Sequence, residues 1–204
     1  MPPEREINYL KGIFICHGKT ELCIGKHICT KLHLNIKPYS KDKGGHSIEI
    51  TDLNTILNKY PFDTISNFKD AYGVEVIGKG KKQKICNFKL FIIMDLDHLG
   101  DKIRKDYISK KMFEEHWLYE YIVPILNVEN IDDVLLQSKV IDKKVKDNEK
   151  GHFYETVFPI NKAPLCYDTY QEAVTLKERL SKNKNTNMDE FIEYCISNVK
   201  SFKK

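Results

Sequence analysis

Apolar residues along the chain gather in short runs, and longer segments with helical spacing separate these runs. Four runs predict β-strands, at residues 12–16, 32–37, 88–94 and 122–128. The run at 88–94 is apolar at nearly every position, which is typical of a strand covered on both faces in a parallel sheet. Apolar residues at helical spacing predict helices at 22–28, 47–58 and 109–121. This alternation of strand and helix predicts an α/β fold with a mainly parallel sheet.

The C-terminal part of the chain has a different pattern. Helices are predicted near residues 170–180 and 188–199, after an aromatic segment at 152–160. A chain of 204 residues has room for one domain of ordinary size with a short appendage. We therefore expect an α/β domain over residues 10–145 and a mainly helical C-terminal extension, residues 146–204, packed on it. The extension is expected to serve oligomerisation or the docking of a partner.

Composition indicates a globular protein with a core, since 41% of the residues are hydrophobic and 30% are charged. The net charge of +4 is small, so the distribution of lysines matters more than their number. Lysines cluster at 79–84, 102–111, 143–150 and 200–204, either as solvated loops or as a phosphate-binding rim. No apolar run is long enough to span a bilayer, and the N-terminus is polar and acidic. We expect a cytoplasmic protein with no membrane partner.

Six cysteines are present, and none of them forms a CxxC pair. In a cytoplasmic chain they are most simply buried thiols. Cys23, His27 and Cys29 lie close together in the sequence, which leaves a zinc site as an alternative. A second paired set of ligands is absent from the sequence, so the buried-thiol interpretation is preferred.

Acidic residues follow the predicted strands where those strands end. Asp95 and Asp97 come directly after the apolar run at 88–94, while Glu21 and Glu129 lie in loops after two other strands. Because ligand sites of parallel sheets form at the carboxyl ends of the strands, we expect these loops to meet. Neighbouring carboxylates repel each other, and a divalent cation relieves the repulsion. Mg²⁺ bound in this way suits phosphoryl-transfer chemistry.

Four short segments occur in the order found in the Toprim family. They are FICHGKTE at 14–21, KGGHSI at 43–48, FIIMDLD at 91–97 and VENI at 128–131. The first resembles the Toprim strand followed by Glu-Gly, the second the family's glycine turn, and the third its DxD strand. The fourth is similar to the Glu-Asn segment of the overcoming-lysogenization-defect nucleases. The resemblance covers roughly residues 10 to 140 and implies a Toprim-like Rossmannoid domain.

The resemblance also implies a function. It suggests a nuclease that depends on Mg²⁺ or Mn²⁺ and cleaves phosphodiester bonds of DNA or RNA. The small size favours the nuclease branch, with its RloB-like and AriB-like effectors of antiphage defence and abortive infection. A partner ATPase is common in that branch, and a homodimer is kept as an alternative assembly.

The resemblance assigns roles to the residues at the predicted sheet edge. It implies that Glu21, Asp95 and Asp97 bind the metal, with Glu129 as a supporting ligand. His17 stands where the family has the glutamate of its Glu-Gly pair. Histidine can transfer protons near neutral pH, so His17 or Glu21 is expected to handle the proton.

Substrate contacts are expected from Lys19, which would bind a phosphate, and from the turn at Lys43, Gly44 and Gly45. A non-catalytic alternative also follows, in which His17 marks lost chemistry and the domain binds nucleic acid or a partner ATPase. A third alternative is a doubly wound phosphate-binding domain in which Gly44 and Gly45 hold a nucleotide. The spacing at residues 17–20 is a poor match to a P-loop, which disfavours this last alternative.

Overall fold

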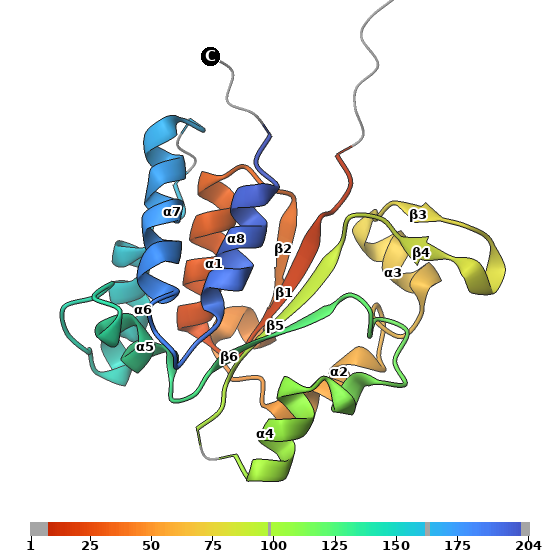
Figure 1. Ribbon diagram of the computed structural model, residues 1–204, viewed down its shortest axis with the longest axis horizontal. Coiled ribbons are helices and arrows are strands. Elements are labelled where there is room, and N and C mark those ends of the chain that lie inside the picture. Colours follow the sequence, from red (N-terminus) through yellow and green to blue (C-terminus); the bar gives the residue numbers. More distant parts are fainter. Residues whose placement is uncertain (1–7, 98, 162–163, 201–204) are drawn as a thin grey trace, which may run out of the picture.

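A four-stranded parallel sheet forms the centre of the molecule in the computed structural model, which describes residues 8–97, 99–161 and 164–200. Its strands are β1 (Gly12–Cys16), β2 (Ile36–Tyr39), β5 (Lys89–Asp95) and β6 (Ile122–Asn127), in the order β2-β1-β5-β6. All neighbouring strands of this sheet run parallel (Figure 1). The predicted α/β fold with a mainly parallel sheet is confirmed.

Helices cover both faces of this sheet (Figure 1). They are α1 (Lys19–Lys31), α2 (Leu53–Leu57), α3 (Ile65–Tyr72), α4 (Asp101–Ile108), α5 (Ile131–Gln137), α6 (Asp147–Val157), α7 (Tyr167–Leu180) and α8 (Met188–Ser197). A small antiparallel hairpin of β3 (Val76–Ile77) and β4 (Lys84–Ile85) lies apart from the main sheet. Short 3₁₀ turns occur at Lys41–Gly44, Ile50–Asp52, Gly80–Lys82 and Lys111–Phe113.

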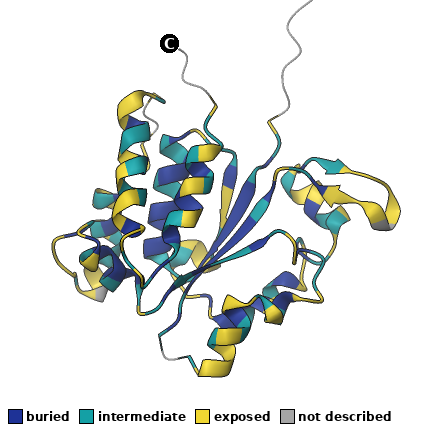
Figure 2. Ribbon diagram, viewed as in Figure 1, coloured by how far each residue is buried: buried dark blue, intermediate teal, exposed yellow. Residues whose placement is uncertain are grey.

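The central strands supply side chains to two separate cores. Successive residues of a strand point to opposite faces, so Phe14 joins the core beneath α1 and α8 while Ile13 joins the core beneath α2 and α3. In Figure 2, β1 is buried along its whole length and β5 is buried between its two end residues, because each strand is covered on both faces. Gly25 of α1 allows this packing, since a Cβ atom there would lie 2.3 Å from the Phe14 ring. The near-continuous apolar runs of β1 and β5 follow from this double burial.

The C-terminal helices complete one of these cores rather than forming their own. Phe191 of α8 packs against Phe14 and Phe91 of the sheet, with ring centroids 5.4 and 5.1 Å apart. The segment before α8 also continues the edge of the sheet, because Val128 N donates to Asn185 O over 2.8 Å. The predicted helical C-terminal region is confirmed, and it shares its core with the α/β part across residue 145.

Two predicted elements lie at different positions from those expected. Strand β2 spans Ile36–Tyr39 and continues through Pro38, whereas the prediction placed the strand at 32–37. The strand is at the edge of the sheet, where a missing backbone N–H is tolerated. The helix expected at 109–121 is also misplaced, since α4 ends at Ile108 and Lys110 takes a left-handed φ of 63°.

The cysteines are all free thiols, and four of them, Cys16, Cys23, Cys29 and Cys195, are buried. His27, a residue of the alternative zinc site, donates a hydrogen bond from Nδ1 to the carbonyl of Pro159 over 2.8 Å. Among the helices built from described residues, none has the length and hydropathy needed to cross a bilayer.

Candidate functional site

The carboxyl ends of β1, β5 and β6 open into a pocket of about 660 Å³. Its walls come from the loop after β1, the loop after β5, the start of α5 and the segment leading into α6. Four acidic residues line it, namely Glu21, Asp95, Asp97 and Asp132. Four lysines line it as well, namely Lys19, Lys144, Lys146 and Lys150. A pocket of about 710 Å³ beside β2 and α1 is mostly apolar and has no acidic residue in its lining, so it is a poor site for cation chemistry.

Glu21 lies in the first turn of α1 and is 1% exposed. One carboxylate oxygen, Oε2, accepts a hydrogen bond from Gly18 N over 3.1 Å, whereas Oε1 is buried without a hydrogen-bond partner among the described residues. Burial raises the pKa of Glu21 to about 7, and the charge of Asp132 adds to this rise. A buried carboxylate oxygen without a partner is costly, and a cation would satisfy it.

Asp95 ends β5 and faces the same region of the pocket. Its Oδ1 accepts a hydrogen bond from Asn127 Nδ2 over 2.9 Å. Burial is the main cause that raises the pKa of Asp95 to about 8, and repulsion from Glu21 adds to this rise. The hydrogen bond from Asn127 and the electrostatic interaction with His17 lower the same pKa. With pKa values of about 7 and about 8, the two carboxyl groups retain protons at neutral pH when no cation is present.

The backbone between the two aspartates is fixed by hydrogen bonds. Leu96 N donates to Asn127 O over 2.8 Å, and the Leu96 carbonyl accepts from Arg104 Nη2 over 2.8 Å. Leu96 itself is buried in the core beneath α4, while both aspartates line the pocket. Asp95 and Asp97 therefore both line the pocket, together with Glu21 from the first turn of α1.

His17 also lines the pocket, and its ring has a defined proton position. Nδ1 lies 3.0 Å from the carbonyl oxygen of Ile48, which can only accept, so Nδ1 carries the proton. The main chains of His17 and Ile48 are joined as well, since Ile48 N donates to His17 O over 2.9 Å. In the neutral ring, Nε2 therefore has the lone pair and can accept a proton or bind a metal.

Lys19 lines the pocket and pairs with Glu155 of α6, with Nζ 2.8 Å from Oε1. The expected substrate turn lies elsewhere. Lys43, Gly44 and Gly45 are absent from the pocket lining, and Lys43 and Gly45 are exposed. Gly44 has a φ of +85°, and a Cβ atom there would come within 3.1 Å of Lys19 Cα. The glycine turn thus packs behind the first turn of α1 and supports the loop after β1.

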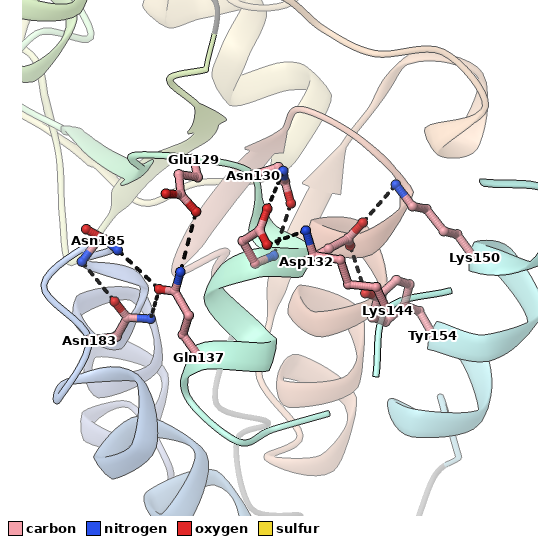
Figure 3. Close-up of polar contacts among 10 residues, drawn as sticks. Glu129, Asn130, Asp132, Gln137, Lys144, Lys150, Tyr154, Asn183 and Asn185 are labelled. Atoms are coloured by element: carbon pink, nitrogen blue, oxygen red, sulfur yellow. Dashed lines mark hydrogen bonds and ion pairs between the residues drawn. The ribbon is translucent and has the colours of Figure 1, made fainter. Parts of the chain in front are cut away.

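Glu129 points away from the pocket (Figure 3). Its Oε2 accepts a hydrogen bond from Gln137 over 3.4 Å, and Gln137 in turn accepts from Asn183 and Asn185. The residue is exposed. The structure therefore does not bring Glu129 together with the other predicted ligands.

Asp132, rather than the predicted Glu129, lines the pocket from the start of α5. It is 7% exposed, and its Oδ1 accepts hydrogen bonds from Tyr154 over 2.7 Å and from Thr20 over 3.5 Å. Its Oδ2 lies 2.7 Å from Lys150 Nζ (Figure 3). The sequence held a signal for this residue, because Asn130 caps α5 and acidic residues are favoured in the first turn that follows.

Asn127 is a second residue that sequence reasoning missed. It is fully buried, donates to Asp95, and accepts a hydrogen bond on Oδ1 from Thr186 Oγ1 over 2.8 Å. Thr186 in turn accepts from Met188 N at the start of α8. Its partner Thr186 is remote in the sequence, so no local pattern marks this contact.

Across residues 8–97, 99–161 and 164–200, no group of three or more His, Cys, Asp or Glu side chains is arranged to hold a metal ion. Mg²⁺ needs only one or two carboxylates when water and phosphate oxygens supply the other ligands. The pair of Glu21 and Asp95 fits this requirement, since burial raises both pKa values and Glu21 Oε1 has no hydrogen-bond partner among the described residues. The chain matches no protein-family model, and it has no significant match among curated proteins or solved structures.

Proposed function

We propose that this protein is a Toprim-type nuclease that uses Mg²⁺ to cleave phosphodiester bonds of DNA or RNA. The observation that carries the proposal is the pair of buried carboxyl groups, Glu21 and Asp95, at the carboxyl edge of a parallel sheet. One oxygen of this pair has no hydrogen-bond partner in the described chain. A role in antiphage defence rests on the sequence resemblance alone.

Glu21 and Asp95 would hold the cation, and Asp97, which lines the same pocket, would bind its water ligands. When bound, Mg²⁺ would polarise a phosphate oxygen and neutralise the negative charge that develops during cleavage. Neutral His17 can accept a proton from an attacking water at Nε2, because Nδ1 donates to Ile48. Lys19, 2.8 Å from Glu155, lies at the pocket rim where a phosphate would approach.

A cleavage assay tests the proposal. The protein is incubated with plasmid, single-stranded DNA or total tRNA, with Mg²⁺, Mn²⁺ or a chelator. We expect cleavage that needs the cation and falls at least about 100-fold in Asp95→Asn and Glu21→Gln, since even residues behind a metal ligand cost about 10–100-fold. The matched controls are Asp70→Asn and Glu115→Gln, both exposed and outside the pocket, and they should cleave normally. Cleavage that persists in Asp95→Asn would refute the metal assignment.

A non-catalytic domain is the second candidate, and one residue favours it. His17 replaces the acid that the resemblance expects at the end of β1. If wild-type protein binds nucleic acid but cuts none of the three substrates with either cation, this second function is supported.

A further inference from the structure

The pocket has two chemically different sides. The carboxyl group of Glu21 comes from the first turn of α1 and that of Asp95 from the end of β5. Three of the four lining lysines come instead from the segment that joins α5 to α6 and from α6 itself. These are Lys144, Lys146 and Lys150, defined here as the lysine rim. The lysine rim therefore borders the carboxyl pair along one side of a single cavity.

The segment that carries the lysine rim is anchored at both ends. Ile141 is buried in the core, and the carbonyl of Lys139 accepts a hydrogen bond from Arg179 over 2.8 Å. At the other end, Tyr154 of α6 is fully buried and donates to Asp132 over 2.7 Å. The lysines thus extend from a built part of the fold, which lowers the entropy lost when they bind a ligand.

Within the described part of the chain, two of the rim lysines are in ion pairs and the third is not. Lys144 pairs with Asp133, and Lys150 lies 2.7 Å from Asp132 (Figure 3). Lys146 is exposed and has no ion-pair partner in the described chain. Its charge is therefore available to an anion without breaking an existing pair.

Charge balance predicts the kind of ligand. The lining has four lysines and four acidic residues, so its formal charge is zero when every carboxyl group is ionised. A divalent cation at the carboxyl pair would make the lining positive by two charges. Glu155 and Asp133, which pair with Lys19 and Lys144 from outside the lining, offset part of this charge. Lys146 then supplies a positive charge suited to a phosphodiester backbone, which carries one negative charge per phosphate.

We infer that the lysine rim binds the sugar–phosphate backbone of a nucleic-acid strand, with Lys146 contacting a phosphate next to the one at the carboxyl pair. This inference rests on the proposed function, because it takes the carboxyl pair as the cation site. It places the strand along the α5–α6 side of the pocket rather than along the glycine turn at Lys43. DNA and RNA share this phosphate chemistry, and both are included in the test.

Lys146→Gln is the decisive variant, since it removes a charge without breaking an ion pair of the described chain. Lys143→Gln is its matched control, because Lys143 is exposed in the same segment but does not line the pocket. Binding of short fluorescein-labelled DNA and RNA oligonucleotides is measured by fluorescence anisotropy, with Ca²⁺ as the cation, between about 50 and 200 mM salt. Thermal unfolding of each variant confirms that it is folded.

Lys146→Gln is expected to weaken binding about 3- to 10-fold and to reduce the slope of log K against log salt by about one. Lys143→Gln should stay within about twofold of the wild type. Equal binding by the two variants, or no binding by the wild type, would overturn the inference. If Lys146→Gln weakens binding but the wild type does not cleave, the nuclease proposal is refuted and binding by the lysine rim is supported. If the wild type cleaves but the two variants bind equally well, binding by the lysine rim is refuted and the nuclease proposal is supported.

Discussion

The carboxyl groups of Glu21 and Asp95 determine how the site responds to protons. In an unfolded chain both carboxyl groups have pKa values of about 4. In the folded protein, burial raises the pKa of Glu21 to about 7 and that of Asp95 to about 8, with the charge of Asp132 adding to the first rise and the charge of Glu21 adding to the second. Between about pH 4 and pH 8, the folded protein therefore binds more protons than the unfolded chain. Under the proposed function, a cation would compete with protons for this pair of carboxyl groups.

We predict that the metal-free protein loses stability as pH rises. A raised folded-state pKa means that the contribution of these groups is fully present below the unfolded pKa and is lost as pH rises through the folded pKa. The free energy of unfolding should fall by several kcal/mol between about pH 5 and 8, because each unit between the unfolded and the folded pKa corresponds to about 1.4 kcal/mol. Urea unfolding in the presence of a chelator, over a series of pH values, measures this change.

Mg²⁺ should reverse this loss, and its stabilising effect should be larger at pH 8 than at pH 5, where protons occupy the pair. Glu21→Gln provides the internal comparison, because it removes the repulsion and should flatten the pH dependence of stability. An equal Mg²⁺ effect at both pH values would contradict the assignment of the cation to this pair.

At the scale of elements, β6 and the segment before α8 support the site together. Asn127 of β6 donates to Asp95, and Thr186 donates to Asn127. The amide group of Asn127 is thereby held with its nitrogen toward Asp95, since its oxygen is occupied. Thr186 therefore acts on Asp95 through Asn127, as a positioning residue.

Thr186→Val should leave Asn127 Oδ1 without its partner and Met188 N without its acceptor. A buried unsatisfied polar group costs about 1–3 kcal/mol, so the free energy of unfolding should fall by that amount. Cation affinity should fall about 10-fold, as is usual for residues behind a ligand. Calorimetric titration with Mg²⁺ and urea unfolding measure the two effects. Thr186→Ser keeps the hydroxyl group and should restore both, and failure of this rescue would argue against positioning.

The local sequence was sufficient to predict an element where the residues of one segment alone determine its burial. The apolar run at 88–94 predicted β5, and its acidic end predicted the place of Asp95 and Asp97. Local sequence was insufficient where distant contacts decide. Trp117 gives the segment at 109–121 an apolar spacing that resembles a helix, but its indole donates to Phe62 O over 2.7 Å in a turn region. Thr186, far from Asn127 in the sequence, could be linked to it only by the fold.

The molecule as a whole is built around a sheet that uses both halves of the chain. Helices α1 and α8 cover one face together, and α8 follows the residues that continue the edge of β6 (Figure 1). The C-terminal residues expected to form an extension therefore supply part of the core and part of the support of the site. Removing them would expose Phe14 and Phe91, which lie against Phe191.

Phe191→Ala tests whether the C-terminal helices and the sheet unfold as one unit. Phe191 is fully buried against both central strands, so the cavity should lower the free energy of unfolding by about 3–5 kcal/mol. Urea unfolding followed by far-ultraviolet circular dichroism and by Trp117 fluorescence should give one coincident transition, shifted to lower urea. Tyr167→Ala is the control, since Tyr167 is 68% exposed and its loss should cost less than about 0.5 kcal/mol. Two separate transitions, with only the circular dichroism signal shifted by Phe191→Ala, would show that the C-terminal helices fold independently and merely dock on the sheet.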